Sequence, residues 1–235
     1  MEKEQETANW YRDYYARVGR KRNDLRGNPG VLFQTLANEG SVVKAMRQVI
    51  HDPSAALVLD VGCGAGGDLF QLLRLGYDPG KISGIDILSD RIRIAKSTYP
   101  SMKFMEGDAR KMNLANDCFD LVFESTMFAT LNDNDMRKSI AEEMLRICKV
   151  NGYILLVDWR TPMIWNKSYK ALTRKEVRRL FGVGTRTTVE TIQRGALVPP
   201  IGRFLSAFAP WIYFLVAGLL PFLVGQVTYV LKKTR

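Results

Sequence analysis

The segment that most constrains this chain is Leu57–Gly67, which reads LVLDVGCGAGG. An apolar, β-branched run ends near Asp60, and a loop with four glycines follows it. Glycine lets a loop turn sharply and lets a ligand approach bare backbone. The amphipathic stretch 68–76 indicates a helix whose first N–H groups face the same ligand. The segment therefore predicts a buried strand, a ligand-binding loop and a helix, in that order.

The alternation of strand-like and helix-like segments continues along the chain. Ser89 and Asp133 are suited to cap helices, and Asn151-Gly152 predicts a turn. Such alternation predicts an α/β fold with a doubly wound, mostly parallel sheet, in which a ligand lies beyond the carboxyl ends of the strands. We expect strands at 57–62, 81–87, 103–108, 118–125 and 153–159, and helices at 9–26, 31–50, 68–76, 89–100, 133–149 and 173–181.

The length of 235 residues fits one domain. We divide residues 1–235 into a helical lead-in (1–50), a cofactor-binding core (51–160) and a substrate side (161–235). The three cysteines are widely spaced and form no C-x-x-C pair, which argues against a disulfide framework or a zinc site. This usage fits a reduced, cytoplasmic protein, and the polar start MEKEQETANW predicts no cleaved signal peptide.

Three acids at the predicted strand ends discriminate between cofactor classes. Gly62, Gly64 and Gly67 match the spacing of a dinucleotide loop, so a nicotinamide-dependent oxidoreductase is one alternative. Asp60 argues against it, because a carboxylate there repels a pyrophosphate and suits a cationic ligand. Asp86 could accept hydrogen bonds from ribose hydroxyls in either class.

The segments LVLDVGCGAGGDL, GIDILSDRI, GDARKMNL, FDLVFES and EEMLRICKVNGYILLVD resemble the successive motifs of class I S-adenosylmethionine-dependent methyltransferases over roughly residues 50–160. The resemblance implies S-adenosylmethionine as cofactor and a seven-stranded sheet. It also implies the binding residues: Asp60, Gly62, Cys63, Gly64 and Gly66 on the methionine side, Asp86 and Ile87 at the ribose, Asp108 and Ala109 at the adenine, and Glu124 and Ser125 where the fourth strand opens onto cofactor and substrate.

The lead-in could cover the cofactor, as similar segments do in related enzymes. Tyr11, Tyr14, Tyr15 and Arg26 are candidates to contact the methionine carboxylate or the methyl-transfer centre. The alternative is a helix that packs on the sheet edge.

An alcohol acceptor needs a general base to take its proton. The single histidine, His51, precedes the first strand and lies behind the predicted site. Glu124 and Asp158 end the fourth and fifth strands, so either could be the catalytic base, or could instead hold the cofactor's amine or a loop. We find no acid cluster at metal-ligand spacing, and therefore expect no metal. The fourth strand lacks N-P-P-Y/F, which argues against methylation of amides or nucleobases.

The last third of the chain is basic and then apolar. Residues 160–203 hold ten Lys or Arg and two acids, which indicates an anionic partner or a solvated face. Residues 204–231 carry no charge. One interpretation is a transmembrane anchor. The other makes 185–193 the sixth strand, 202–219 a helix and 225–233 the seventh strand, inserted antiparallel. Either allows docking to the cytoplasmic face of a membrane or to a lipid-linked substrate.

The tail ALVPPIGRFLSAFAPW…LPFLVGQVTYVLKK is also similar to tails of small bacterial methyltransferases that accompany sugar-modifying enzymes. The resemblance implies O-methylation of a sugar, glycan or lipid-linked glycan hydroxyl. The alternatives are another small molecule or a lipid as acceptor and, outside this class, an NAD-dependent oxidoreductase or a non-catalytic cofactor-binding scaffold. No recognised nucleic-acid-binding module is present, so we expect no nucleic acid partner.

Overall fold

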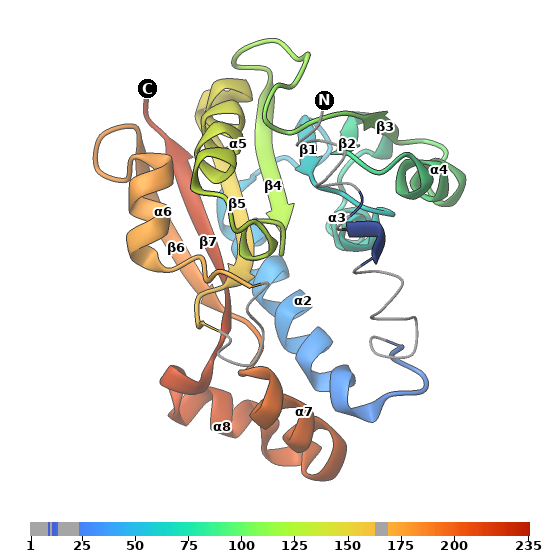
Figure 1. The fold of residues 1–235 in the computed structure, drawn as a ribbon, viewed down its shortest axis with the longest axis vertical. Coiled ribbons are helices and arrows are strands. Elements are labelled where there is room, and N and C mark those ends of the chain that lie inside the picture. The colour runs from blue at the N-terminus through green and yellow to red at the C-terminus, as the bar shows by residue number, and fades with distance from the viewer. Residues whose placement is uncertain (1–8, 10, 14–23, 163–168) are drawn as a thin grey trace.

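The computed structural model describes residues 9, 11–13, 24–162 and 169–235. It contains a seven-stranded sheet with the order β3-β2-β1-β4-β5-β7-β6 (Figure 1). The first five strands are parallel, and the last pairs antiparallel with both of its neighbours. The bounds are β1 (Val58–Val61), β2 (Ile82–Asp86), β3 (Lys103–Glu106), β4 (Phe119–Ser125), β5 (Cys148–Trp159), β6 (Thr187–Arg194) and β7 (Gln226–Lys233). The predicted fold and the antiparallel insertion of the seventh strand are confirmed.

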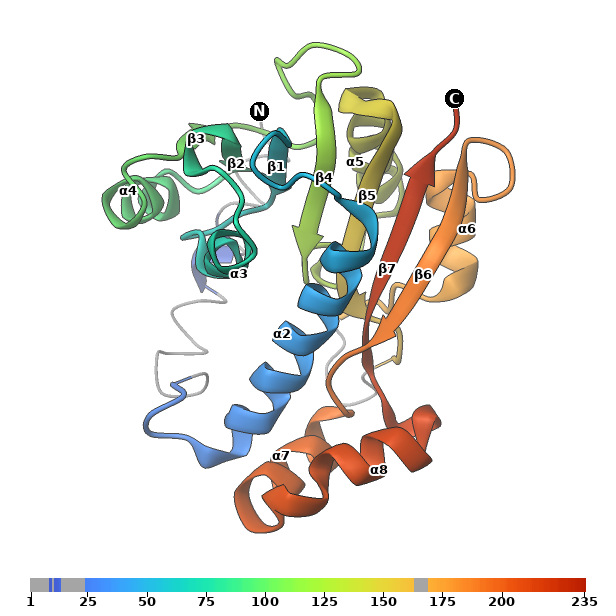
Figure 2. The same cartoon turned by 180° about the vertical axis from the view of Figure 1, so that it is seen from behind.

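Helices cover both faces of the sheet, and each face has its own core. Apolar side chains of α5 and α6 pack on one face, and those of α2, α3 and α4 pack on the other (Figures 1 and 2). The helices α7 and α8 lie at the carboxyl edge of β4 and β5. The bounds are α2 (Pro29–Val49), α3 (Phe70–Arg74), α4 (Ser89–Thr98), α5 (Asn134–Ile147), α6 (Arg174–Phe181), α7 (Pro199–Phe208) and α8 (Tyr213–Leu219).

Three local predictions were wrong. Ser89 is the first residue of α4 rather than its cap, and the Leu88 N–H donates to the Asp86 carboxylate instead. Asn151-Gly152 is not a turn that precedes a strand, because β5 already begins at Cys148. It lies in a bulge of β5, where Asn151 takes a positive φ of 66° while pairing with β4 resumes at Tyr153. The single helix expected over 202–219 is two helices, because Pro210 has no N–H with which to continue α7.

Other local predictions were confirmed. The Asp133 carboxylate caps α5 by accepting from the N–H groups of Asp135 and Met136. Residues 31–50 fall almost entirely in one helix, α2. Of the lead-in, Asn9 and 11–13 are helical, whereas Tyr14 and Tyr15 lie outside the described residues. In the described ranges, no helix is long and apolar enough to cross a membrane.

Candidate functional site

The glycine loop after β1 has the backbone conformation that its sequence predicts. Gly62, Gly64 and Gly66 have φ values of 75°, 52° and 80°, in the left-handed region that glycine tolerates. A Cβ atom on Gly66 would lie 3.1 Å from the Tyr99 ring, whereas one on Gly64 would meet nothing within 4 Å. The loop is therefore packed on the Gly66 side and open at Gly64, where a ligand can reach the backbone.

Asp86, at the end of β2, ties the glycine loop to its neighbouring strand. Its carboxylate accepts from Gly64 N and Leu88 N, each at 2.8 Å. Burial raises its pKa, and the two backbone hydrogen bonds work against that shift. A carboxylate oxygen can accept more than one hydrogen bond, so this geometry leaves capacity for ribose hydroxyls. The role at the ribose stays a prediction, as it does for the partly buried Ile87.

Three carboxylates surround the glycine loop. Burial raises the pKa of Asp60 well above its ordinary value, and the charges of Asp68 and Asp86 raise it further. The structure shows no hydrogen bond to the Asp60 carboxylate from the residues it describes. Asp68 was missed by the sequence analysis, since an acid in the first turn of a helix is ordinarily a cap. An acidic cluster with a fully buried member suits a cation.

Two predicted cofactor contacts have other partners. The Cys63 side chain is buried over β2, and its Sγ is 2.7 Å from where a Cβ on Gly84 would lie. It therefore packs against that strand, and burial raises the pKa of its thiol. The Asp108 carboxylate accepts from Arg110 Nε at 2.7 Å and from Arg110 N at 2.8 Å. Its adenine role, and that of the neighbouring Ala109, stays a prediction.

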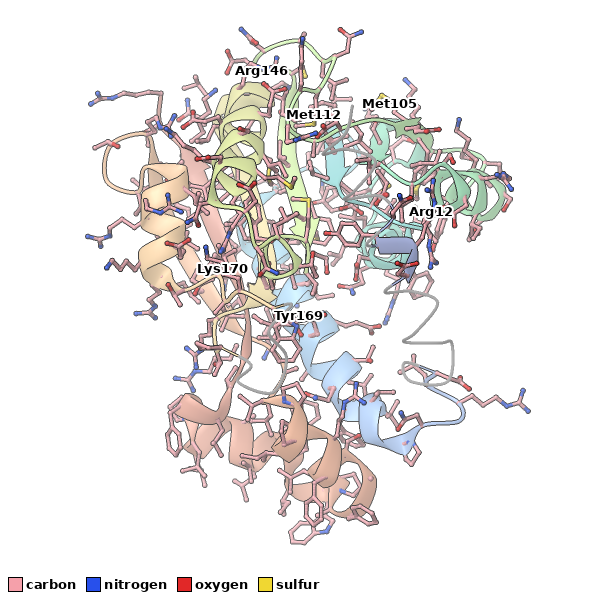
Figure 3. All side chains as sticks on the ribbon, in the orientation of Figure 1. Arg12, Met105, Met112, Arg146, Tyr169 and Lys170 are labelled. Atoms are coloured by element: carbon pink, nitrogen blue, oxygen red, sulfur yellow. The ribbon has the colours of Figure 1, made fainter. Side chains whose placement is uncertain are left out.

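The lead-in reaches the loop after β4. The Tyr11 hydroxyl lies 2.5 Å from Thr130 Oγ1, and Thr130 Oγ1 in turn donates to Met127 O at 2.7 Å. Arg12 is labelled in Figure 3, and Figures 1 and 2 show its helical segment beside α3. Arg26 is exposed in the turn before α2, and its guanidinium forms no hydrogen bond within the described chain. The structure thus brings Tyr11 to the site.

Glu124 and Asp158, the two candidate bases, are fully buried and hold one turn. Glu124 Oε2 accepts from Met127 N at 3.0 Å, and Asp158 Oδ2 accepts from Ala129 N at 2.8 Å. The other Asp158 oxygen accepts from Trp159 N at 2.6 Å, whereas Glu124 Oε1 has no partner among the described residues. Neither carboxyl group has exposed surface, so the geometry supports a role in positioning the turn that holds Met127 and Ala129. The role of either residue as the catalytic base stays a prediction.

Glu124 and Asp158 are two acids that share a fully buried site, and each has a raised pKa. Burial raises the pKa of Asp158 to about 7. Burial and the charge of Asp158 raise the pKa of Glu124 well above its usual value. Arg137, which the sequence analysis missed, is also fully buried, and its Nη1 lies 3.6 Å from Glu176 Oε2. The charged sequence around Arg137 gives no signal that this side chain turns inward.

Lys170, beyond β5, contacts the turn that follows β4 and the start of α5. Lys170 N donates to Ala129 O at 2.8 Å, and Lys170 Nζ donates to Asn134 Oδ1 at 2.5 Å. Tyr169 and Lys170 lie near the carboxyl end of β5, in front of α2 (Figure 3). Ser125 is partly buried at the end of β4, and its hydroxyl lowers the pKa of Asp68. No group of three potential metal ligands occurs within the described ranges.

Comparison with known proteins identifies similar chains. The family described as "Methyltransferase domain" matches residues 53–193. The demethylmenaquinone methyltransferase of Chlorobaculum parvum is 26% identical over 148 residues, which cover 62% of this chain and 59% of that protein. The fatty-acid O-methyltransferase of Mycolicibacterium smegmatis is 29% identical over 111 residues, covering 46% and 39%. The chain thus spans less than two thirds of the length of these relatives.

A solved structure has a similar fold. The geranyl diphosphate C-methyltransferase of Streptomyces coelicolor, in complex with Mg²⁺, geranyl diphosphate and S-adenosyl-L-homocysteine, superposes with a TM-score of 0.62. The match covers 83% of this chain and 80% of that one, at 14% identity. At this identity, the match supports the fold alone.

Proposed function

Because this chain belongs to the methyltransferase domain family, we propose that it is a class I S-adenosylmethionine-dependent methyltransferase whose acceptor is carried on an apolar chain. The observation that carries the cofactor assignment is the set of three carboxylates, Asp60, Asp68 and Asp86, around an open glycine loop. Asp68 and Asp86 raise the pKa of Asp60, and a nearby cation would stabilise the charged form of such a carboxylate. S-adenosylmethionine has a sulfonium and an ammonium group, whereas NAD would bring a pyrophosphate to the same acids.

The residues present fit this cofactor. Gly64 leaves its backbone open, Asp86 retains acceptor capacity for ribose hydroxyls, and Asp60 has a buried carboxylate to which no described residue donates a hydrogen bond. When bound, the cofactor supplies an electrophilic methyl group. The protein's part is to exclude water and to orient the acceptor, which is how positioning accelerates a displacement. Glu124 and Asp158 fix the turn over Met127 and Ala129 that borders this space.

The apolar acceptor is supported by the relatives and by the surface beside the site. The relatives' names specify a quinone and a fatty acid as acceptors, and the structural neighbour is named for a prenyl diphosphate. In this chain, α7 and α8 lie at the carboxyl edge of the sheet and expose several large apolar side chains. A sugar or lipid-linked glycan, which the tail resemblance implies, remains a second candidate acceptor.

The cofactor assignment is tested by calorimetric titration with S-adenosylmethionine and, separately, with NAD. We expect micromolar binding of S-adenosylmethionine and a fall of about tenfold or more in Asp86→Ala, which loses a charge-assisted acceptor. Asp90→Ala is the matched control, because Asp90 is an exposed acid four residues along. Binding of NAD alone, or equal losses in both variants, would refute the assignment.

The acceptor class is tested with a panel: a prenylated hydroquinone, a long-chain fatty acid, a lipid-linked sugar and a free sugar. The readout is S-adenosylhomocysteine release. We expect turnover with the prenylated hydroquinone or the fatty acid and none with either sugar acceptor. The reverse pattern would instead favour the glycan hydroxyl.

A further inference from the structure

The two helices α7 and α8 present their apolar side chains to solvent. Phe208 and Trp211 have exposed fractions of 76% and 82%, and Leu219 and Phe222 are each exposed by 71%. We define the apolar tip as Phe204, Phe208, Trp211, Leu215, Leu219 and Phe222, all of which are more than half exposed. Isolated exposed apolar residues are ordinary, but a concentration of aromatic and leucine side chains within nineteen residues marks an interaction surface.

Two polar side chains of the same helices, those of Ser206 and Tyr213, face inward. Ser206 Oγ accepts from Phe33 N at 3.1 Å and donates to Pro29 O at 2.5 Å. The Tyr213 hydroxyl accepts from Leu197 N at 3.1 Å and donates to Gln34 Oε1 at 3.0 Å. A helix that faces water has the opposite arrangement. The hydrogen bonds thus dock α7 and α8 on α2 with the apolar tip turned outward.

The shape and length of this surface fit contact with a lipid layer. Figures 1 and 2 show α7 and α8 at one extremity of the molecule, beyond the carboxyl edge of the sheet. At 1.5 Å per residue, the ten residues of α7 span about 15 Å. A bilayer's hydrocarbon core is roughly 30 Å thick. The helices can therefore lie in the interface but are too short to cross it.

The charge around the tip favours an anionic partner. The chain has no acidic residue from Thr191 to Arg235. Arg160 donates through Nε to Val224 O at 2.8 Å and through Nη2 to Pro221 O at 2.5 Å, and Arg194 Nη1 donates to Gly218 O at 3.4 Å. These contacts hold two guanidinium groups beside α8. Together with Arg203 on α7, they form a basic margin next to the apolar tip.

We propose that the apolar tip inserts into the interface of an anionic lipid bilayer, with Arg160, Arg194 and Arg203 beside the lipid headgroups. Trp is enriched at the headgroup boundary, Phe and Leu form the apolar face of interfacial helices, and arginines add attraction to anionic lipids. A second copy of the chain fits less well, because a two-fold contact would bring two basic margins together. The inference does not require methyl transfer, but it would place the acceptor site at the surface from which an apolar acceptor is drawn.

The test is vesicle flotation of the full chain without cofactor or acceptor. Vesicles of phosphatidylcholine alone are compared with vesicles that also contain phosphatidylglycerol. We expect binding that favours the anionic vesicles and weakens at high salt. The double variant Phe208→Ser/Trp211→Ser should bind at least about tenfold more weakly, because interfacial binding scales with the apolar area buried. Ile94→Ser/Val150→Ser is the matched control, since both residues are exposed and lie outside α7 and α8.

The outcomes separate the occupants of this surface. Loss of flotation in the tip variant but not in the control supports the proposal, provided that both melt like the parent. No binding to either vesicle, or equal binding of the two variants, overturns it. A dimer in sedimentation that the tip variant abolishes, without flotation, assigns the surface to a second copy instead. Equal binding to both vesicle types overturns the role of the arginines. Because no cofactor is present, none of these outcomes bears on the proposed methyl transfer.

Discussion

The glycine loop and the helices α7 and α8 lie at the same edge of the sheet but arrange their polar groups in opposite ways. At the loop, carboxylates lie inside the protein with repulsion between them and open backbone beside them. At α7 and α8, polar groups turned inward are satisfied by α2, and apolar groups face outward. At the loop, the repulsion between buried carboxylates is unfavourable, and a small cation would reduce it. At α7 and α8, the exposure of apolar side chains to water is unfavourable, and contact with a larger apolar surface would reduce it. Each region thus has the property that the partner proposed for it above would use.

Substitution of a glycine with positive φ in the loop should reduce the free energy of unfolding more than a surface substitution in α7 or α8. Gly66→Val places a β-branched residue at a φ of 80°, with its Cβ near the Tyr99 ring. We expect a loss of about 4 kcal/mol in the free energy of unfolding, from backbone strain and overpacking together. Gly67→Ala is the control, because its Cβ would meet nothing and its φ is not positive. Denaturant unfolding that shows similar losses in both variants would contradict this account.

The buried acids behind the loop should make stability depend on pH. The pKa of Asp158 is about 7 in the folded chain and near 3.8 when unfolded. A raised pKa contributes stability that is complete below the unfolded value and is lost as the pH rises through the folded one. We expect the free energy of unfolding to fall by about 3 kcal/mol between pH 4 and pH 8. Asp158→Asn should flatten this profile and Asp135→Asn should not, as measured by urea unfolding across the range.

The buried carboxylate of Asp60 should strengthen the binding of S-adenosylmethionine but lower the stability of the free protein. Asp60→Asn removes a buried carboxylate that has no hydrogen-bond donor in the described chain. We expect S-adenosylmethionine to bind about tenfold more weakly and the free protein to gain about 1 kcal/mol in stability at neutral pH. Calorimetry and thermal unfolding of one preparation measure both effects. A variant that loses stability and affinity together would show that Asp60 is a structural residue.

The inside-out arrangement of α7 and α8 predicts a contrast between two neighbouring aromatic residues. Tyr213→Phe removes a hydroxyl that makes one buried and one partly buried hydrogen bond, and should cost about 1–2 kcal/mol. Trp211→Ser changes a residue that is 82% exposed and should change stability by about 0.5 kcal/mol or less. Chemical denaturation of the two single variants decides this. A larger loss at Trp211 would mean that the apolar tip packs on the protein in solution.

The sequence predicts the loop well because local rules decide it. Positive φ values select glycine, and strand ends place Asp60 and Asp86 at one edge. The interpretation of 225–233 as a seventh strand inserted antiparallel is confirmed, because β7 pairs antiparallel with both β5 and β6. Other features depend on contacts distant in sequence. Arg137 is buried next to Glu176, which lies thirty-nine residues later in the chain. Asp86 accepts hydrogen bonds from the N–H groups of Gly64 and Leu88, and this arrangement competes with the local preference of Ser89 to cap α4.

The place of β7 has a consequence for the order in which the molecule assembles. Residues 226–233 follow α7 and α8 in the chain, yet they separate β5 from β6 in the sheet. During synthesis, β5 therefore has no neighbour on that side until the apolar helices have already emerged. Lys233, whose Nζ binds Asp117 Oδ1 and Cys148 O, fastens the last residue of that strand. Pairings this distant form late and leave a sheet edge open meanwhile. Before β7 forms, a nascent chain of this protein thus exposes both the unpaired edge of β5 and the apolar side chains of α7 and α8. This is the stage at which a chaperone would bind the largest exposed surface.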